Sequence, residues 1–182
     1  MRKYGVIYAD PPWRYRNKPS GRSPEDHYPT MHIDDIAALP VKELADENCV
    51  LLLWVTFPML RDVWQVIDAW GFKYKTVAFV WIKLAPQKES IHWGLGYWTR
   101  SNSEICLLAT KGTPRRKANN IHQVIISHVE EHSKKPEEAR RRIEALMGDV
   151  PKIELFARRA SPGWDVWGNE VECDIDLKCL SP

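Results

Sequence analysis

Asp10-Pro11-Pro12-Trp13 is the stretch of this sequence whose residue types are best suited to chemistry. The Asp10 carboxylate accepts hydrogen bonds, and the Pro-Pro pair fixes the backbone so that the Pro11 carbonyl is held as a second acceptor. Trp13 adds an aromatic face for a flat ring. An exocyclic amine needs such acceptors, because its lone pair is delocalised into the ring and must be drawn toward tetrahedral geometry. We therefore predict that Asp10, Pro11, Pro12 and Trp13 form a turn that activates an amine for alkylation.

The position of this turn supports a role in ligand binding. The apolar run that precedes it predicts a buried strand over Tyr4–Ala9. A strand that ends in a rigid turn presents its groups at the carboxyl edge of the sheet, where open α/β sheets bind ligands. The turn alone does not separate adenine from cytosine or glutamine, since related turns serve all three amines.

Composition and length predict one globular domain over residues 1–182. Apolar residues make up 44% of the chain and charged residues 27%, and no apolar run approaches the roughly 18 residues of a membrane span. The beginning of the sequence lacks the pattern of a secretory leader, so we expect a cytoplasmic protein without membrane association. The four cysteines show no metal-ligand spacing, and we expect no metal.

Several catalytic classes lack their motifs in this sequence. No P-loop and no GxGxxG fingerprint occurs, which argues against nucleotide hydrolysis and the usual dinucleotide binding. No nucleophilic serine or cysteine lies in a recognisable elbow. A group to be transferred to an amine must therefore come from a bound cofactor.

The net charge of +2 does not by itself indicate a nucleic-acid partner, but the basic residues are clustered. The first of three clusters lies directly after the turn, where its residues could contact phosphates beside a bound base. The clusters are Arg14, Arg16, Lys18 and Arg22; Lys111, Arg115, Arg116 and Lys117; and Lys134, Lys135 and Arg140–Arg142.

Strand-like and helix-like segments alternate along the chain, which predicts a mainly parallel, doubly wound sheet of the Rossmann-like type. Two long segments without periodicity, about 14–32 and 83–103, are expected to be functional loops. Strands are predicted over Tyr4–Ala9, Cys49–Val55, Lys73–Ile82, Glu104–Thr110, His122–Ile126, Lys152–Phe156 and Trp164–Trp167. Helices are predicted over Ile33–Leu44, with a break at Pro40, over Pro58–Trp70 and over Pro136–Met147.

A series of short motifs, in order along almost the whole chain, resembles the MT-A70 group of S-adenosylmethionine-dependent adenine N6-methyltransferases, especially its small bacterial and phage members. The motifs are ADPPW (9–13), HYPTM (27–31), LLLWVT (51–56), WGF (70–72), FVWIK (79–83), GYWTRSNSE (96–104), ATKG (109–112), HSKKPEE (132–138), KIELFAR (152–158) and WGNE (167–170). The resemblance implies a class I methyltransferase fold with a circularly permuted motif order.

The resemblance also implies roles for individual residues. Asp10 and the Pro11 carbonyl would orient the amine, with Trp13 and Tyr28 beside the target adenine. The other implied substrate contacts are Arg14, Lys83, Trp98 and Arg100. The implied contacts to S-adenosylmethionine are Asp10, Lys135, Phe156, Arg158, Asn169 and Glu170, with Ser161 in place of an asparagine that relatives often carry.

In the permuted order, the strand end that contacts the cofactor adenine in some relatives would fall near the C-terminus. We therefore propose that Asp174 and Ile175 cap the cofactor adenine. The expected partner is nucleic acid, with DNA favoured over RNA, and a homodimer or a second methyltransferase-like subunit is left open. The alternatives are methylation of RNA, an inactive nucleic-acid-binding subunit, and methylation of a free nucleotide or small amine.

Overall fold

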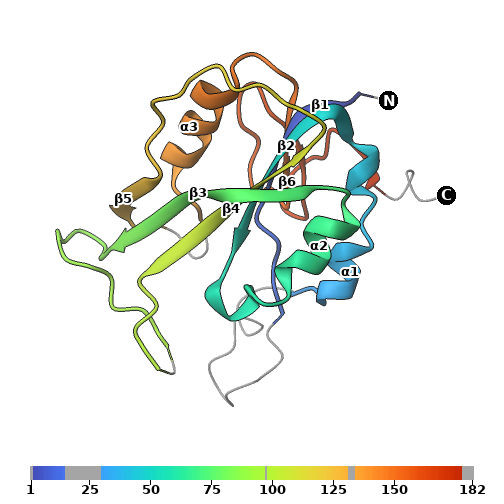
Figure 1. Ribbon diagram of the computed structural model, residues 1–182. Coiled ribbons are helices and arrows are strands. Elements are labelled where there is room, and N and C mark those ends of the chain that lie inside the picture. Colours follow the sequence, from blue (N-terminus) through green and yellow to red (C-terminus); the bar gives the residue numbers. More distant parts are fainter. Residues whose placement is uncertain (1, 15–29, 97, 131–133, 178–182) are drawn as a thin grey trace.

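The computed structural model describes residues 2–14, 30–96, 98–130 and 134–177. In this part of the chain, strands and helices alternate along the sequence (Figure 1). The strands are β1 (Tyr4–Ala9), β2 (Ala45–Val55), β3 (Lys73–Leu84), β4 (Ser103–Lys111), β5 (Val124–His128), β6 (Lys152–Leu155) and β7 (Asp165–Trp167). The α-helices are α1 (Ile33–Ala37), α2 (Val63–Ala69) and α3 (Glu137–Met147), and short 3-10 helices cover Val41–Glu43 and Phe57–Met59.

These strands form a single sheet in the order β5-β3-β4-β2-β1-β6-β7. The pairs β1–β2, β1–β6, β6–β7 and β3–β5 are parallel, whereas β4 is antiparallel to both of its neighbours, β2 and β3. The predicted mainly parallel sheet is therefore confirmed. The reversed strand was not predicted, because the apolar pattern of a buried strand does not encode its direction.

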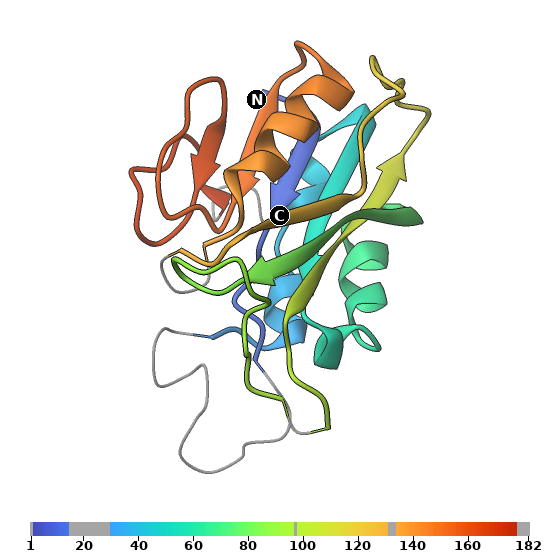
Figure 2. The ribbon, with the colours of Figure 1, turned by 90° about the vertical axis from the view of Figure 1, so that its left-hand side faces the viewer.

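Helices cover both faces of the sheet, as a doubly wound fold requires. Alternate residues of the central strands point to opposite faces: Ile7 and Leu53 pack with α1 and α2 in one core, and Tyr8 and Trp54 pack with α3 in the other. Figure 2 shows α3 in front of the sheet, with α1 and α2 behind it.

Of two predicted helical segments, one agrees with the structure and the other contains a shorter α-helix than predicted. The segment Ile33–Leu44 is broken at Pro40, as expected, into α1 and a 3-10 turn. The predicted helix over Pro58–Trp70 is instead a 3-10 turn over Phe57–Met59 followed by α2. Of the apolar residues whose 3,4 spacing predicted this helix, Val63, Ile67 and Trp70 are buried, whereas Trp64 is 39% exposed. Apolar spacing thus predicted most of the buried face and overestimated the length of the helix.

Strand β1 lies at the point where the chain changes direction across the sheet. After β1 the chain passes to β2 on one side, and β6, which lies on the other side of β1, is followed by β7 farther out. The chain therefore leaves the carboxyl ends of β1 and β6 in opposite directions. Such a topological switch point is where open α/β sheets bind ligands. Asp10 directly follows β1. Among the described residues, no helix is long and apolar enough to cross a membrane.

Candidate active site

The motif turn is anchored on both sides by backbone hydrogen bonds. Trp13 N–H donates to the Pro11 carbonyl over 2.9 Å, so this carbonyl keeps one lone pair for a further donor. The returning chain pairs with the turn, because Met31 N–H donates to the Pro12 carbonyl at 2.8 Å and Arg14 N–H donates to the Met31 carbonyl at 3.1 Å. The turn is therefore a fixed part of the scaffold.

The side chain of Trp13 is buried, with 5% relative exposure, and it belongs to the core between the sheet, α1 and α2. Its indole N–H donates to the Trp54 carbonyl at 3.0 Å. A ring enclosed in this way has no open face for a base. Burial therefore argues against the stacking role predicted for Trp13 and favours a role in holding the turn.

Asp10 forms the centre of the site. Its side chain is 28% exposed, and Lys135 Nζ donates to Oδ2 over 2.7 Å, so Oδ1 is left for a second donor. Lys135 directly precedes Pro136, the N-cap residue of α3. The chain crossing from β5 to β6 therefore brings a lysine from 125 positions away onto the motif carboxylate.

Two further charged residues continue this contact into the interior. Lys135 Nζ also lies 3.3 Å from Glu104 Oε2, and Glu104 Oε1 accepts a hydrogen bond from Lys83. Glu104 lies near the start of β4, and Lys83 near the end of β3. Because β4 runs against β3, the start of one strand lies beside the end of the other. The four residues thus form one line of alternating charge.

The two lysines rest on tryptophan rings. Lys135 Nζ lies 5.6 Å from the centre of the Trp54 ring, and Lys83 Nζ lies 5.0 Å from that of Trp81. The rings meet edge to face, with centroids 6.4 Å apart. Each is held by its own N–H, because Trp54 donates to the Tyr8 hydroxyl at 2.7 Å and Trp81 to the Ser127 hydroxyl at 2.9 Å. This aromatic floor restricts where the ammonium groups can lie.

Burial and neighbouring charges shift the pKa values of the charged residues in this line. Burial raises the pKa of Asp10 above its usual range, although Lys135 opposes this shift. Burial alone would raise the pKa of Glu104, but Lys135 and Lys83 outweigh it and hold this pKa below its usual value. Burial alone would lower the pKa of Lys135, yet the attraction of Asp10 and Glu104 raises it. Lys135 is therefore cationic at neutral pH, and Asp10 is the carboxylate that accepts a proton more readily.

The ends of β6 and β7 form the neighbouring part of the edge. Ala157 N–H donates to the Trp167 carbonyl at 2.9 Å, and a Cβ at Gly168 would lie 2.0 Å from the Ala157 oxygen, so only glycine fits there. Phe156 adopts φ = 63°, and its ring meets Trp167 edge to face at 5.4 Å. A left-handed non-glycine residue at a strand end costs energy and is typical of functional sites.

Polar side chains follow directly on these strand ends. Arg158 is 42% exposed, its Nε lies 3.8 Å from Glu170 Oε1, and its charge acts on Asp10. Asn169 and Glu170 are exposed. Donors and acceptors thus stand beside Asp10 at the switch point, together with a close-packed glycine. This arrangement fits a nucleoside-containing cofactor such as S-adenosylmethionine, whose ribose hydroxyls and charged amino-acid end need such partners.

Three residues predicted to contact the cofactor also have structural partners. The Asp174 carboxylate accepts a hydrogen bond from Val166 N–H at 2.8 Å, and Asp174 N–H donates to the Val166 carbonyl at 3.0 Å. Asp174 therefore covers the free edge of β7, and its proposed contact with the cofactor adenine stays a prediction. Ile175 packs against the core on the α1 and α2 side. The Ser161 carbonyl accepts from Trp164 N–H at 3.1 Å and closes the turn before β7.

The predicted substrate contacts are distributed over two regions. Arg14 Nη1 lies 2.7 Å from His32 Nε2 beside the motif turn, and Tyr28 lies outside the described residues. Lys83 contacts Glu104 and belongs to the charged line. Arg100 and Trp98, the latter 92% exposed, lie in the segment between β3 and β4, which projects at the lower left of Figure 1. The Arg100 guanidinium lies 5.1 Å from the centre of the Trp93 ring.

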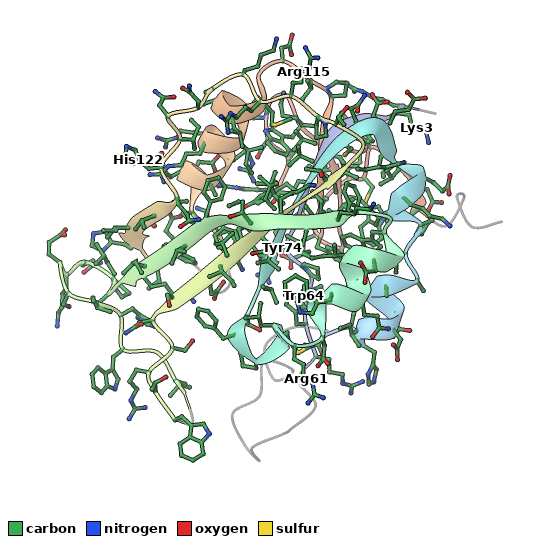
Figure 3. All side chains as sticks on the ribbon, in the orientation of Figure 1. Lys3, Arg61, Trp64, Tyr74, Arg115 and His122 are labelled. Atoms are coloured by element: carbon green, nitrogen blue, oxygen red, sulfur yellow. The ribbon has the colours of Figure 1, made fainter. Side chains whose placement is uncertain are left out.

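The second basic cluster begins at Lys111, which pairs in β4 with Cys49 near the amino end of β2, whereas in the third cluster Lys135 contacts Asp10. Figure 3 shows Arg115 at the opposite end of the molecule from Arg61, which follows β2. In the third cluster, acidic residues on α3 and β6 neutralise Arg140 and Arg142.

Two acidic residues complete the site, and neither of them was assigned a role from the sequence. Glu104 bridges the two lysines, and Glu154 on β6 accepts a hydrogen bond from Arg140 at 2.5 Å. Arg140 also pairs with Glu137 at 2.8 Å, which ties the start of α3 to β6. The available signal was a charged residue within an apolar strand, because such a residue needs a partner. No group of three or more His, Cys, Asp or Glu residues in the described part of the chain could hold a metal ion.

Comparison with known proteins decides the class of this site. The MT-A70 family model matches residues 4–170. The chain belongs to the MT-A70 family. It is therefore an S-adenosylmethionine-dependent adenine N6-methyltransferase. The candidate active site is thus the part of an MT-A70 fold where β1 ends in the DPPW turn.

Relatives in this family differ in how much of their length the chain covers. A type II methyltransferase, M.MunI, from Mycoplasma sp is 35% identical over 191 residues, covering 93% of this chain and 78% of that protein. An Arabidopsis thaliana N(6)-adenosine-methyltransferase MT-A70-like protein is 33% identical, and the human N(6)-adenosine-methyltransferase catalytic subunit METTL3 is 30% identical. These alignments cover 92% and 93% of this chain, but only 24% and 28% of the relatives.

Proposed function

We propose that this chain methylates the N6 amine of adenine in DNA by direct attack of the amine nitrogen on the cofactor's methyl group. The observation that carries the proposal is the position of Asp10. It follows β1 at the switch point of the sheet, it is the most exposed member of a buried charged line, and one of its oxygens is left for a donor. A carboxylate in this position can orient an amine at the edge where the cofactor binds.

Asp10 accepts a hydrogen bond from the N6 amine through Oδ1, and the remaining lone pair of the Pro11 carbonyl accepts the second N–H. When bound, S-adenosylmethionine supplies a methyl group already activated by its sulfonium sulfur. Asp10 and the Pro11 carbonyl would hold the amine so that its nitrogen lone pair faces this methyl carbon, and the electron pair of the carbon–sulfur bond would leave with the cofactor. The positive charge that develops on nitrogen strengthens its hydrogen bond to Asp10, which is differential stabilisation of the transition state.

The proton released by the methylated amine passes to Asp10. Its pKa, raised by burial, makes it a better proton acceptor than an exposed aspartate. Lys135 keeps the carboxylate oriented and stabilises its ionised form before the reaction. Arg158, Asn169 and Glu170 hold the cofactor's polar ends at the adjoining strand termini, with Phe156 and Gly168 shaping the backbone there.

DNA is the proposed substrate because of the extent of the similarities. The chain covers 78% of the type II methyltransferase but about a quarter of the N(6)-adenosine-methyltransferases. The type II methyltransferase also has the higher identity, 35% against 33% and 30%. Contacts to the DNA strand would come from Arg14, from the segment that carries Trp98 and Arg100, and from Tyr28. The same contacts would serve RNA, which is the second candidate.

An inactive nucleic-acid-binding subunit is the remaining alternative. Against it stands the intact acceptor pair of Asp10 and the Pro11 carbonyl, together with Lys135 on Asp10. A chain that had lost catalysis would not need to keep a partly exposed carboxylate paired within a buried charged line. A homodimer or a second methyltransferase-like subunit is compatible with the proposed activity and would extend the substrate surface.

The proposal is tested with methyl-labelled cofactor and four substrates: single-stranded DNA, duplex DNA, RNA and free adenine nucleotides. We expect label on N6 of adenine in DNA at a higher rate than in RNA or in nucleotides. A preference for RNA would replace the proposed substrate. Binding of cofactor without transfer to any of the four would favour the inactive subunit.

A further inference from the structure

The four charged residues Lys83, Glu104, Lys135 and Asp10 form a line that runs from the interior of the sheet edge to its surface. Relative side-chain exposures are 15% for Lys83, 16% for Glu104 and 11% for Lys135, and they rise to 28% for Asp10. Asp10 is thus the end that a substrate can reach. The two inner members, Lys83 and Glu104, contact other charges in the line.

Lys135 is shared between two carboxylates. Its Nζ lies 2.7 Å from Asp10 Oδ2 and 3.3 Å from Glu104 Oε2. The ring of Trp54 beneath it restricts other positions, so a movement toward one carboxylate is a movement away from the other. Glu104 is in turn shared between Lys135 and Lys83, and Lys83 is held over Trp81. A change of charge at the inner end therefore reaches Asp10 in two ways, through the position of the Lys135 ammonium group and through the direct repulsion between the Glu104 and Asp10 carboxylates.

We propose that Glu104 and Lys83 are positioning residues. They set how strongly Lys135 is attracted to Glu104 relative to Asp10, and thereby how strongly the Asp10 carboxylate can accept a hydrogen bond from the substrate amine. Neither residue touches the reacting atoms. Lys83, which the sequence suggested as a substrate contact, acts instead through Glu104. The inference deepens the proposed function and rests on it in one respect, since it assumes that the Asp10 carboxylate receives the amine.

The sign of each effect follows from the geometry. Without the charge of Glu104, Lys135 is no longer drawn away from Asp10 and the repulsion between the two carboxylates is lost, so the pKa of Asp10 falls. Without the charge of Lys83, Glu104 attracts Lys135 more strongly. Lys135 then interacts less strongly with Asp10, so the pKa of Asp10 rises. The two neutralising substitutions should therefore move the titration of Asp10 in opposite directions, as two losses of generic stability would not.

Other groups that act on Asp10 stay constant in this comparison. Arg158 acts on it from the end of β6, and the charge of Asp10 itself raises the pKa of Tyr8, Cys106 and Glu154 on β1, β4 and β6. The described contacts of the Lys83 ammonium group are with Glu104 and the Trp81 ring. A difference between the Lys83 and Glu104 variants therefore reports on the line itself.

The test follows the Asp10 carboxyl carbon by 13C NMR as pH is varied, in the cofactor-free protein, with the signal assigned from Asp10→Asn. We expect the midpoint to fall by about half a pH unit or more in Glu104→Gln and to rise by a similar amount in Lys83→Met. Glu47→Gln, exposed on β2, and Lys73→Met, exposed at the far end of β3, are matched controls whose midpoints should stay at the wild-type value. Shifts of the same sign, or no shift in either variant, would overturn the proposal.

Conservative variants keep the test decisive if a neutralising substitution prevents folding. Lys83→Arg retains the charge, and we expect it to return the midpoint to the wild-type value. If Glu104→Gln does not fold, the comparison of Lys83→Met with Lys83→Arg still decides, because an unchanged midpoint in Lys83→Met contradicts the proposed transmission. If Lys83→Met does not fold, Glu104→Gln against Glu104→Asp decides in the same way.

Activity provides a second readout that separates this inference from the proposed function. The acid limb of kcat/KM for methyl transfer should shift with the NMR midpoint in each variant. Opposite NMR shifts without methylation of adenine by the wild-type protein would support the line and reject the proposed function. Methylation by the wild-type protein with parallel NMR shifts in the two variants would do the reverse.

Discussion

The indole N–H of Trp13 donates a hydrogen bond to the backbone carbonyl of Trp54 over 3.0 Å, and it thereby ties the motif turn after β1 to the end of β2. Trp54 in turn donates to the Tyr8 hydroxyl, two residues before Asp10. The motif tryptophan is therefore part of the support that positions the carboxylate. Three aromatic side chains connect the turn, the floor beneath Lys135 and the strand that carries the site.

Trp13→Phe separates this supporting role from base stacking. Phenylalanine keeps an aromatic ring but leaves the buried Trp54 carbonyl without its donor, which should lower the free energy of unfolding by about 1 to 3 kcal/mol. Urea denaturation measures this loss. Unchanged stability combined with strongly weakened nucleic-acid binding would show that the ring stacks on the base after all.

Gly168→Ala tests the packing of the two strand ends. Its new Cβ would meet the Ala157 oxygen at 2.0 Å, so the strand ends must separate. We expect a loss of about 1 to 3 kcal/mol in stability and a roughly tenfold weaker cofactor affinity by calorimetry. Gly163→Ala is the matched control: it has φ = 79° and open space around its Cβ, so it should cost about 1 kcal/mol in stability without a change in cofactor affinity. Equal cofactor affinities in the two variants would argue against this role for Gly168.

Arg140 should behave as the partner of a buried charge. The side chains of Arg140 and Glu154 are 10% and 15% exposed, so Arg140→Leu leaves Glu154 without its cation and should cost about 3 to 5 kcal/mol. The double variant Arg140→Leu with Glu154→Leu removes both charges and should recover part of this loss. Thermal or urea unfolding of the three proteins checks it. Strictly additive losses would contradict the coupling.

The contribution of Glu104 to stability should depend on pH with a defined sign. Its pKa is lowered in the folded protein, so its contribution is present above the ordinary glutamate pKa of 4.5 and is lost as the pH falls through the lower folded value. The difference in unfolding free energy between the wild-type protein and Glu104→Gln should therefore shrink when the pH is lowered from 7 to below 4. A difference that grows toward acid pH would show that burial, and not the two lysines, dominates at this residue.

The sequence predicted the parts of the site that depend on local pattern. The run before Asp10 identified β1, the Pro-Pro pair identified the turn, and the order of strands and helices identified the doubly wound sheet. The helix start after Lys135 was also predicted, because Pro136 and the following glutamates are typical of a first turn. These features are encoded over a few neighbouring residues.

The remaining features depend on contacts between distant residues. Nothing local indicates that Lys135 meets Asp10, or that Glu104 joins Lys135 to Lys83, because these contacts require the reversed direction of β4 and the crossing from β5 to β6. The edge contact between Asp174 and Val166 was missed for the same reason. For Trp13, the residue type suggested stacking, whereas the fold, which depends on distant contacts, encloses the ring between the sheet and two helices.

The central claim, that Asp10 orients an adenine amine for methylation, is tested most directly by methyl transfer from labelled S-adenosylmethionine to DNA by the wild-type protein and Asp10→Asn. The DNA is digested and the methylated nucleoside is identified by mass spectrometry. We predict N6-methyladenine from the wild-type protein and at least about a 100-fold lower rate for Asp10→Asn, with cofactor affinity largely retained. Transfer by Asp10→Asn at the wild-type rate, or label on a base other than adenine, would contradict the claim.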